Sequence, residues 1–296
     1  MNKIAFVYFS YNRLNILKES LRTSIENTDK KPDHIYIFDD NSNEECQNYL
    51  KSFKEKNKEL NITLDINEKN IGYAANYKKC FDIIKNENFD YIFFLETDYI
   101  WRKGYLEECI EVLEAEEDSV GICGSSFKEF YQKEKCITWF GDVTKEQFGK
   151  DVSNREKLYT SKILKLKSCN ITIQYGTHCC GTFLFNKKRF FNNLNEDQKS
   201  RFWKIMEEAT KVINNKSVIN DGMITGGISV LWDEYLNLKH KGNSFEKSAF
   251  IDIIDYVIGV HIEGGGINGS DNPEGYTRYF PNKFPKEYDS FLRNEK

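Results

Sequence analysis

The first third of the chain alternates short apolar runs with amphipathic stretches, and this alternation restricts the fold more than any other feature. Runs with the length of buried strands lie at residues 4–9, 34–38, 62–66 and 91–95. The intervening stretches have helical spacing, as in Leu14, Leu17, Leu21 and Ile25. Strands that alternate with helices form βαβ units. We therefore predict an α/β, Rossmann-like domain with a mostly parallel central sheet flanked by helices.

The second half of the chain is less regular. Its apolar patterns predict further strands at 120–123 and 180–185, and helices at 197–213 and 224–238. Glycines at 264, 265, 266 and 269 follow, and three of the 4 prolines come after residue 270. We expect a single domain over residues 1–263, followed by a C-terminal tail over residues 264–296.

Composition argues against several classes of protein. With 42 basic and 46 acidic residues spread along the chain, the formal charge of -4 gives no sign of a nucleic-acid or anionic-membrane surface. The 8 cysteines contain no CxxC pair and are expected to be reduced thiols. Because neither a signal-peptide pattern nor an apolar run long enough for a transmembrane segment occurs, we expect a cytoplasmic protein.

Two of the predicted strands end in acidic clusters. Asp39 and Asp40 follow the second strand, and Glu96 and Asp98 flank Thr97 after the fourth. Ligands of open parallel sheets bind at the carboxyl ends of the strands, where Mg²⁺ or Mn²⁺ takes carboxylate oxygens together with phosphates. The alternatives are a turn or helix cap at Asp39-Asp40 and a solvated loop at Glu96 to Asp98.

Four ordered motifs resemble family-two-type glycosyltransferases of the GT-A fold. They are Ser10-Tyr11-Asn12-Arg13, Ile37-Phe38-Asp39-Asp40-Asn41-Ser42, Asn70-Ile71-Gly72-Tyr73-Ala74-Ala75-Asn76 and Leu95-Glu96-Thr97-Asp98. The resemblance covers about the first 110 residues strongly. It implies a nucleotide-sugar half over about 1–125 and an acceptor half over about 126–263.

The resemblance also implies roles for particular residues. The nucleotide-binding residues would be Ser10, Tyr11, Arg13, Asp39, Asp40, Gly72, Asn76, Glu96 and Thr97, with Asp40 at a uracil base. Asp98 corresponds to the last aspartate of the family's DxD metal motif. Glu96 stands where the family usually has aspartate, and its longer side chain would reach the cation or the ribose through water. His261 resembles a late histidine that supplies a further metal ligand; a structural histidine is the alternative.

The acceptor side has weaker signals. Trp101 is the first candidate for stacking on a sugar, although tryptophan most often belongs to the core. His178 and Gly181 lie near the expected acceptor strand. In the tail, Tyr276, Arg278 and Lys283 would close over the diphosphate, with Arg278 suited to bidentate phosphate contact; a surface tail with chance basic residues competes equally.

The resemblance implies a transfer reaction with a carboxylate base. We expect a Mn²⁺- or Mg²⁺-dependent transfer from a UDP-sugar to an acceptor hydroxyl, with inversion of configuration at the transferred sugar carbon. Asp221 is the first candidate for the base and an N-cap its alternative role; Asp233 and Glu234 are in reserve. The rival functions are a nucleotidyltransferase and an inactive nucleotide-sugar or partner-binding module. The acceptor class stays open among glycan, lipid-linked sugar, protein and modified DNA base, as does the oligomeric state.

Overall fold

The computed structural model describes ten segments of the chain. They are residues 2–97, 99–101, 103–123, 136–138, 141–143, 161–167, 170–175, 183–210, 250–253 and 259–261. The predicted helix at 224–238 and the tail over 264–296 lie outside these segments. The division into a domain over 1–263 and a tail therefore stays a prediction.

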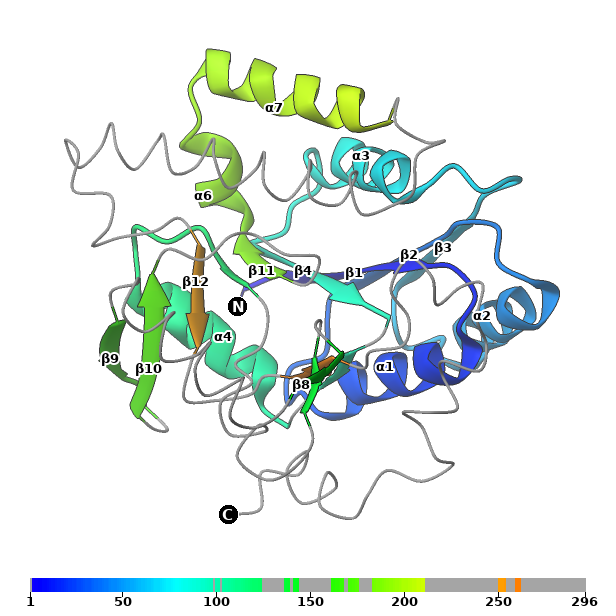
Figure 1. The fold of residues 1–296 in the computed structure, drawn as a ribbon, viewed down its shortest axis with the longest axis horizontal. Coiled ribbons are helices and arrows are strands. Elements are labelled where there is room, and N and C mark those ends of the chain that lie inside the picture. The colour runs from blue at the N-terminus through cyan, green and yellow to red at the C-terminus, as the bar shows by residue number, and fades with distance from the viewer. Residues whose placement is uncertain are drawn as a thin grey trace.

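A nine-stranded mixed sheet forms the centre of the described part, in the order β3-β2-β1-β4-β11-β6-β12-β10-β9 (Figure 1). Its strands are β1 (Ile4–Ser10), β2 (His34–Asp39), β3 (Ile62–Ile66), β4 (Tyr91–Glu96), β6 (Gly121–Cys123), β9 (Ser161–Lys165), β10 (Asn170–Tyr175), β11 (Phe183–Asn186) and β12 (Phe250–Ile253). The first four strands are parallel neighbours, while β11 and β10 run against the strands beside them. The predicted mostly parallel α/β sheet is confirmed.

Two small antiparallel pairs accompany the main sheet. β5 (Tyr99–Trp101) pairs with β13 (Gly259–His261), and β7 (Cys136–Thr138) pairs with β8 (Gly141–Val143). The first of these pairs follows the acidic end of β4 directly. It therefore links a late part of the chain to the predicted metal motif.

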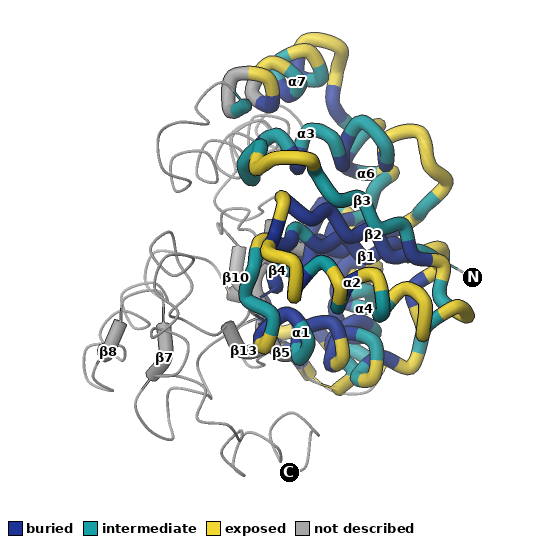
Figure 2. Tube along the Cα trace, turned by 90° about the vertical axis from the view of Figure 1, so that its right-hand side faces the viewer, coloured by how far each residue is buried: buried dark blue, intermediate teal, exposed yellow. Residues whose placement is uncertain are grey.

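Helices cover both faces of the sheet (Figure 1). One face carries α1 (Leu14–Glu26), α2 (Glu44–Lys56) and α4 (Tyr105–Ala115); the other carries α3 (Tyr73–Ile84), α6 (Lys187–Asn192) and α7 (Glu196–Thr210). The tube view shows the central strands buried between helices whose outer turns are exposed (Figure 2). This three-layer arrangement leaves the ends of the strands for ligands.

The strands divide their side chains between two cores. In β1, Phe6 and Tyr8 pack with α1 and α4, whereas Ala5 and Val7 pack with α3. The same alternation holds in β2 and β4, because successive side chains of a strand point to opposite faces. Since both faces are covered, these strands read as continuous apolar runs, which is why the sequence predicts them.

The described cysteine side chains agree with the reduced state expected from the sequence. Cys46, Cys80 and Cys109 are free and buried. Burial, together with the charge of Asp39, raises the pKa of the Cys46 thiol to about 11. A thiol with such a pKa stays protonated and unreactive at neutral pH.

Candidate nucleotide and metal site

The strand-end carboxylates lie at one edge of the sheet. In the parallel register, Ser10 of β1 stands opposite Asp39 of β2, and Phe9 opposite Glu96 of β4. The ends of three neighbouring strands are therefore level. Carboxylates from β2 and β4 flank the end of β1, as the sequence predicts for a ligand site at the carboxyl edge.

Hydrogen bonds tie the loop after β1 to the loop after β2. The Ser42 hydroxyl donates to Asp39 Oδ1 at 2.5 Å, and Ser42 N donates to Asp39 Oδ2 at 2.9 Å. The same Ser42 Oγ accepts from Asn12 N at 2.7 Å, and Asn43 N donates to Asn12 Oδ1 at 2.8 Å. The Asp39 carboxylate is fully buried, so it orders both loops from within.

Three non-glycine residues adopt left-handed backbone conformations in these two loops. Their φ angles are 56° at Asn12, 62° at Arg13 and 61° at Asn41. Asparagine adopts this conformation more readily than most residues, so the unfavourable case is Arg13, and such conformations concentrate at functional sites. The Ser42 contacts supply the surrounding structure that holds Asn12 in this conformation.

Asp40 connects β2 to the start of α3. Its Oδ1 accepts from Ile71 N at 2.7 Å and from Asn67 Nδ2 at 3.1 Å, while its Oδ2 accepts from Gly72 N at 2.9 Å. The Asp40 residue is 6% exposed. Gly72 has a φ of 85°, a value that favours glycine, and it precedes the first turn of α3. The carboxylate thus fixes the glycine-containing loop at the positive end of the helix dipole.

Asn67 and Lys79 extend this network. Asn67 Nδ2 also donates to Asn76 Oδ1 at 2.8 Å, and Lys79 Nζ donates to Asn67 Oδ1 at 3.1 Å. Lys79 forms a salt bridge with Asp65 at 2.7 Å. Asn76 is among the nucleotide-binding residues predicted from the sequence, whereas Asn67 and Lys79 are not. The available signal was the position of Asn67 directly after a predicted strand.

The remaining nucleotide-binding candidates line the same edge. Ser10 is 2% exposed and its Oγ has no hydrogen-bond partner in the described part of the chain. Tyr11, in contrast, is 39% exposed. Arg13 is half-buried at the start of α1. The structure therefore brings the predicted residues of the first three motifs together.

The metal motif is only partly described. Glu96 is half-buried at the end of β4, and its carbonyl oxygen accepts from Ser20 Oγ at 3.1 Å; Thr97 is buried. Asp98 lies outside the described residues, as does the side chain of His261. The backbone register of β5 and β13 pairs His261 with Tyr99, the residue after Asp98. The chain thus carries the backbone of His261 alongside the metal motif.

Trp101 lies in the core. It is 0% exposed and packs against the rings of Phe93 and Tyr105 at centroid distances of 5.2 Å and 5.0 Å. In this structure its ring offers no surface to a sugar. The core alternative of the sequence analysis fits Trp101 better than the stacking role.

The other predicted residues lie outside the described segments. They are His178, Gly181, Asp221, Asp233, Glu234, Tyr276, Arg278 and Lys283. Within the described residues, no cluster of three or more histidine, cysteine, aspartate or glutamate side chains could hold a metal ion. No described helix is long and apolar enough to cross a membrane.

Several solved structures are similar to this chain at low sequence identity. No curated protein matches the chain. The mannosyltransferase PcManGT from Pyrobaculum calidifontis, solved with GDP-Man and Mn²⁺, is 12% identical over 81% of this chain and 74% of its own, with a TM-score of 0.42. S. aureus TarS is 13% identical over 89% of this chain and 37% of its own chain, with a TM-score of 0.48. The structure of TarS residues 1-349 is also 13% identical, and the match covers 98% of this chain and 69% of that chain with a TM-score of 0.49.

The family model for glycosyl transferase family 2 matches residues 6–190. This stretch begins within β1 and ends within α6, so it includes all four strand-end motifs of the site. It also spans more than half of the 296 residues. The chain therefore belongs to glycosyl transferase family 2 and has the GT-A fold.

Proposed function

We propose that this glycosyltransferase moves a sugar from a UDP-sugar to an acceptor hydroxyl with the help of a bound divalent cation. The observation that carries the proposal is the register of β1, β2 and β4, which aligns Asp39, Asp40 and Glu96 at one edge of the sheet. A nucleoside diphosphate fits such an edge, because the base lies by one strand end and the charged phosphates by another.

We propose that Asp40 recognises the uracil base of the donor through a hydrogen bond. A carboxylate offers about four acceptor positions, and the described contacts of Asp40 use three. The remaining position can accept the imide hydrogen of uracil. Exposed Tyr11 and half-buried Arg13 would border the nucleoside, together with Gly72 and Asn76.

Asp98 and His261 are proposed to hold Mn²⁺ or Mg²⁺. Support comes from the pairing of His261 with Tyr99 and from the carboxylate of Glu96 at the end of β4. A carboxylate and an imidazole, completed by diphosphate oxygens and water, form a donor set that Mn²⁺ accepts. The cation would offset the charge that develops on the departing diphosphate. Glu96, one methylene longer than aspartate, would contact the cation through water.

The acceptor half supplies the base in this proposal. Asp221 would remove the proton of the acceptor hydroxyl in an inverting reaction, with Asp233 and Glu234 in reserve. His178 and Gly181 would border the acceptor, and Arg278 of the tail would contact the diphosphate. The protein is proposed to act in the cytoplasm.

A donor screen tests the proposed function. We expect a UDP-sugar with Mn²⁺ to raise the melting temperature more than GDP-, ADP- or dTDP-sugars, since a ligand that binds only the folded state stabilises it. Release of UDP from the stabilising sugar should require Mn²⁺ and stop with EDTA. Equal shifts from all four donors would refute the choice of uracil. Binding without any turnover of the donor, in the presence of candidate acceptors, would instead indicate a binding module.

A further inference from the structure

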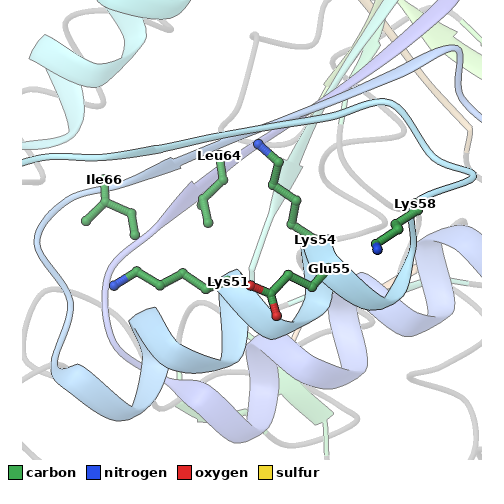
Figure 3. Close-up of a pocket in the computed structure, with 6 residues that line it drawn as sticks. All are labelled: Lys51, Lys54, Glu55, Lys58, Leu64 and Ile66. Atoms are coloured by element: carbon green, nitrogen blue, oxygen red, sulfur yellow. The ribbon is translucent and has the colours of Figure 1, made fainter.

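A basic groove lies between helix α2 and the outer strand β3. Its lining consists of Lys51, Lys54, Glu55 and Lys58 together with Leu64 and Ile66 (Figure 3). The groove is open to solvent and has a volume of about 540 Å³. In this view Lys51 and Lys54 extend from α2 toward β3, and the two aliphatic side chains project from the strand. The groove therefore combines an apolar floor with ammonium groups.

These lysines lack anionic partners. In the described part of the chain, none of Lys51, Lys54 and Lys58 forms a salt bridge or a side-chain hydrogen bond. All three are exposed. Glu55 is the single acidic residue of the lining, so the groove has a net positive charge although the whole chain has a charge of -4. An anionic ligand complements this charge.

The backbone of β3 offers a second binding feature. β3 is the end strand of the nine-stranded sheet, and among the described strands it pairs only with β2. Asn61 O and Asn67 N both bond toward β2, at 2.8 Å and 2.9 Å. Because backbone direction alternates along a strand, the N–H and C=O groups of Ile62, Leu64 and Ile66 point to the open edge.

The side chains of Leu64 and Ile66 line the groove. Ile62 is buried in the core with Leu50 of α2, and Leu64 packs partly buried against that core. Side chains two residues apart share a face, so Leu64 and Ile66 continue toward the lysines. A strand added at this edge would place every second side chain on the same face as the groove. The carbon chain of a glutamate at these positions can contact the apolar floor, and its carboxylate can reach the ammonium groups.

We propose that this groove binds an extended acidic peptide of a partner protein, which adds to the sheet beside β3. Strand addition uses the free backbone groups for affinity and the alternate side chains for specificity. Lysines can also shield an exposed edge strand from other chains. The charge complementarity and the apolar floor favour the acidic peptide. The inference does not depend on the proposed glycosyl transfer.

Fluorescence anisotropy with labelled synthetic peptides tests the inference. A peptide that alternates glutamate and valine should bind the full chain, with an affinity that falls as salt rises. A peptide with lysine in place of glutamate should not bind. Inorganic polyphosphate serves as the probe for a different anionic polymer. If polyphosphate competes the peptide away and itself binds more tightly, the groove is a phosphate-polymer site and the peptide inference is wrong.

A matched pair of variants locates the binding surface. Lys54 and Lys56 both lie in the last turn of α2, but only Lys54 lines the groove. Both substitutions to glutamate remove the same favourable charge from the helix C-terminus. We expect Lys54→Glu to weaken peptide binding about fivefold and Lys56→Glu to change it less than about twofold. Equal effects would place the peptide elsewhere.

Backbone pairing has its own test. Two further glutamate–valine peptides carry N-methyl groups, one on the odd-numbered and the other on the even-numbered backbone nitrogens. A peptide paired with β3 presents only one of these two sets to the strand. We therefore expect one methylated peptide to lose binding and the other to keep it. Loss by both or by neither would overturn strand addition.

Discussion

Replacement of Asp40 by asparagine probes the contact that fixes the start of α3. The two carboxylate oxygens of Asp40 accept from separate backbone donors, Ile71 N at 2.7 Å and Gly72 N at 2.9 Å. An amide has one oxygen, so its NH₂ group must face one of these N–H groups. At that position two N–H donors then face each other and the hydrogen bond is lost. Because Asp40 is only 6% exposed, water cannot readily replace the lost acceptor.

The magnitude follows from the bonds that are lost. A hydrogen bond to a charged group contributes about 1.5–3 kcal/mol, and a buried donor without a partner costs about 1–3 kcal/mol. Since Asn67 can still reach the amide oxygen, we expect Asp40→Asn to lower the free energy of unfolding by about 3 kcal/mol. Urea unfolding followed by tryptophan fluorescence measures this quantity.

Asp39→Asn is the matched control. The Asp39 carboxylate meets Ser42 N and the Ser42 hydroxyl, and a hydroxyl can accept from an amide as readily as it donates. We expect this variant to lose only about 1 kcal/mol. If Asp40→Asn is as stable as the wild type, Asp40 does not fix α3. If that stable variant binds UDP more weakly but binds pyrophosphate as the wild type does, the role of Asp40 is recognition of the base alone.

Four further predictions concern other parts of the chain. Asp98→Asn should weaken UDP binding in the presence of Mn²⁺ by calorimetry, and affinity equal to wild type would remove Asp98 from the cation site. Asparagine is as good a helix cap as aspartate, so Asp221→Asn should lower the transfer rate at least about 100-fold with donor affinity nearly unchanged. A near wild-type rate would direct attention to Asp233 and Glu234. Arg189 Nη1 donates to the carbonyl oxygens of Leu113, Glu116 and Ser119 at 2.7–3.0 Å. Arg189→Gln should therefore lower the free energy of unfolding by about 2 kcal/mol, measured by urea denaturation, and an unchanged denaturation midpoint would contradict this. Burial lowers the pKa of His34, so protonation favours the unfolded chain, and the free energy of unfolding falls as the pH drops through about 6.5. His34→Gln should show a smaller loss of this free energy between pH 7.5 and 5.5. A loss equal to that of the wild type would assign the pH dependence to other groups.

The sequence predicts the strands that are buried on both faces. β1, β2 and β4 appear where continuous apolar runs lie, because helices cover both sides of these strands and select apolar residues at successive positions. β3 instead alternates Ile62, Leu64 and Ile66 with polar residues, and the core packs against the face that carries Ile62 and Leu64. The helix predicted at 197–213 is α7, Glu196–Thr210. The strand predicted at 180–185 is β11, Phe183–Asn186.

Strand β9, and the position of β11 within the sheet, could not be predicted from local patterns. β9 contains Lys162 and Lys165 and forms the far edge of the sheet, where exposed positions accept charged residues. β11 inserts between β4 and β6 and runs antiparallel to both. These two pairings join segments about 90 and about 60 residues apart in sequence, and no local periodicity encodes them.

Adjacent acidic residues at a strand end repel each other, and the sequence alone suggests that a cation or ligand relieves the repulsion. In the structure, hydrogen-bond donors of the protein already perform this task. Asn41, with its φ of 61°, follows a pair of carboxylates that diverge: Asp39 points to Ser42, and Asp40 points to the start of α3. The two charges therefore order the loops before a donor arrives, which leaves the cation free to act on the diphosphate at the end of β4 in the proposed reaction.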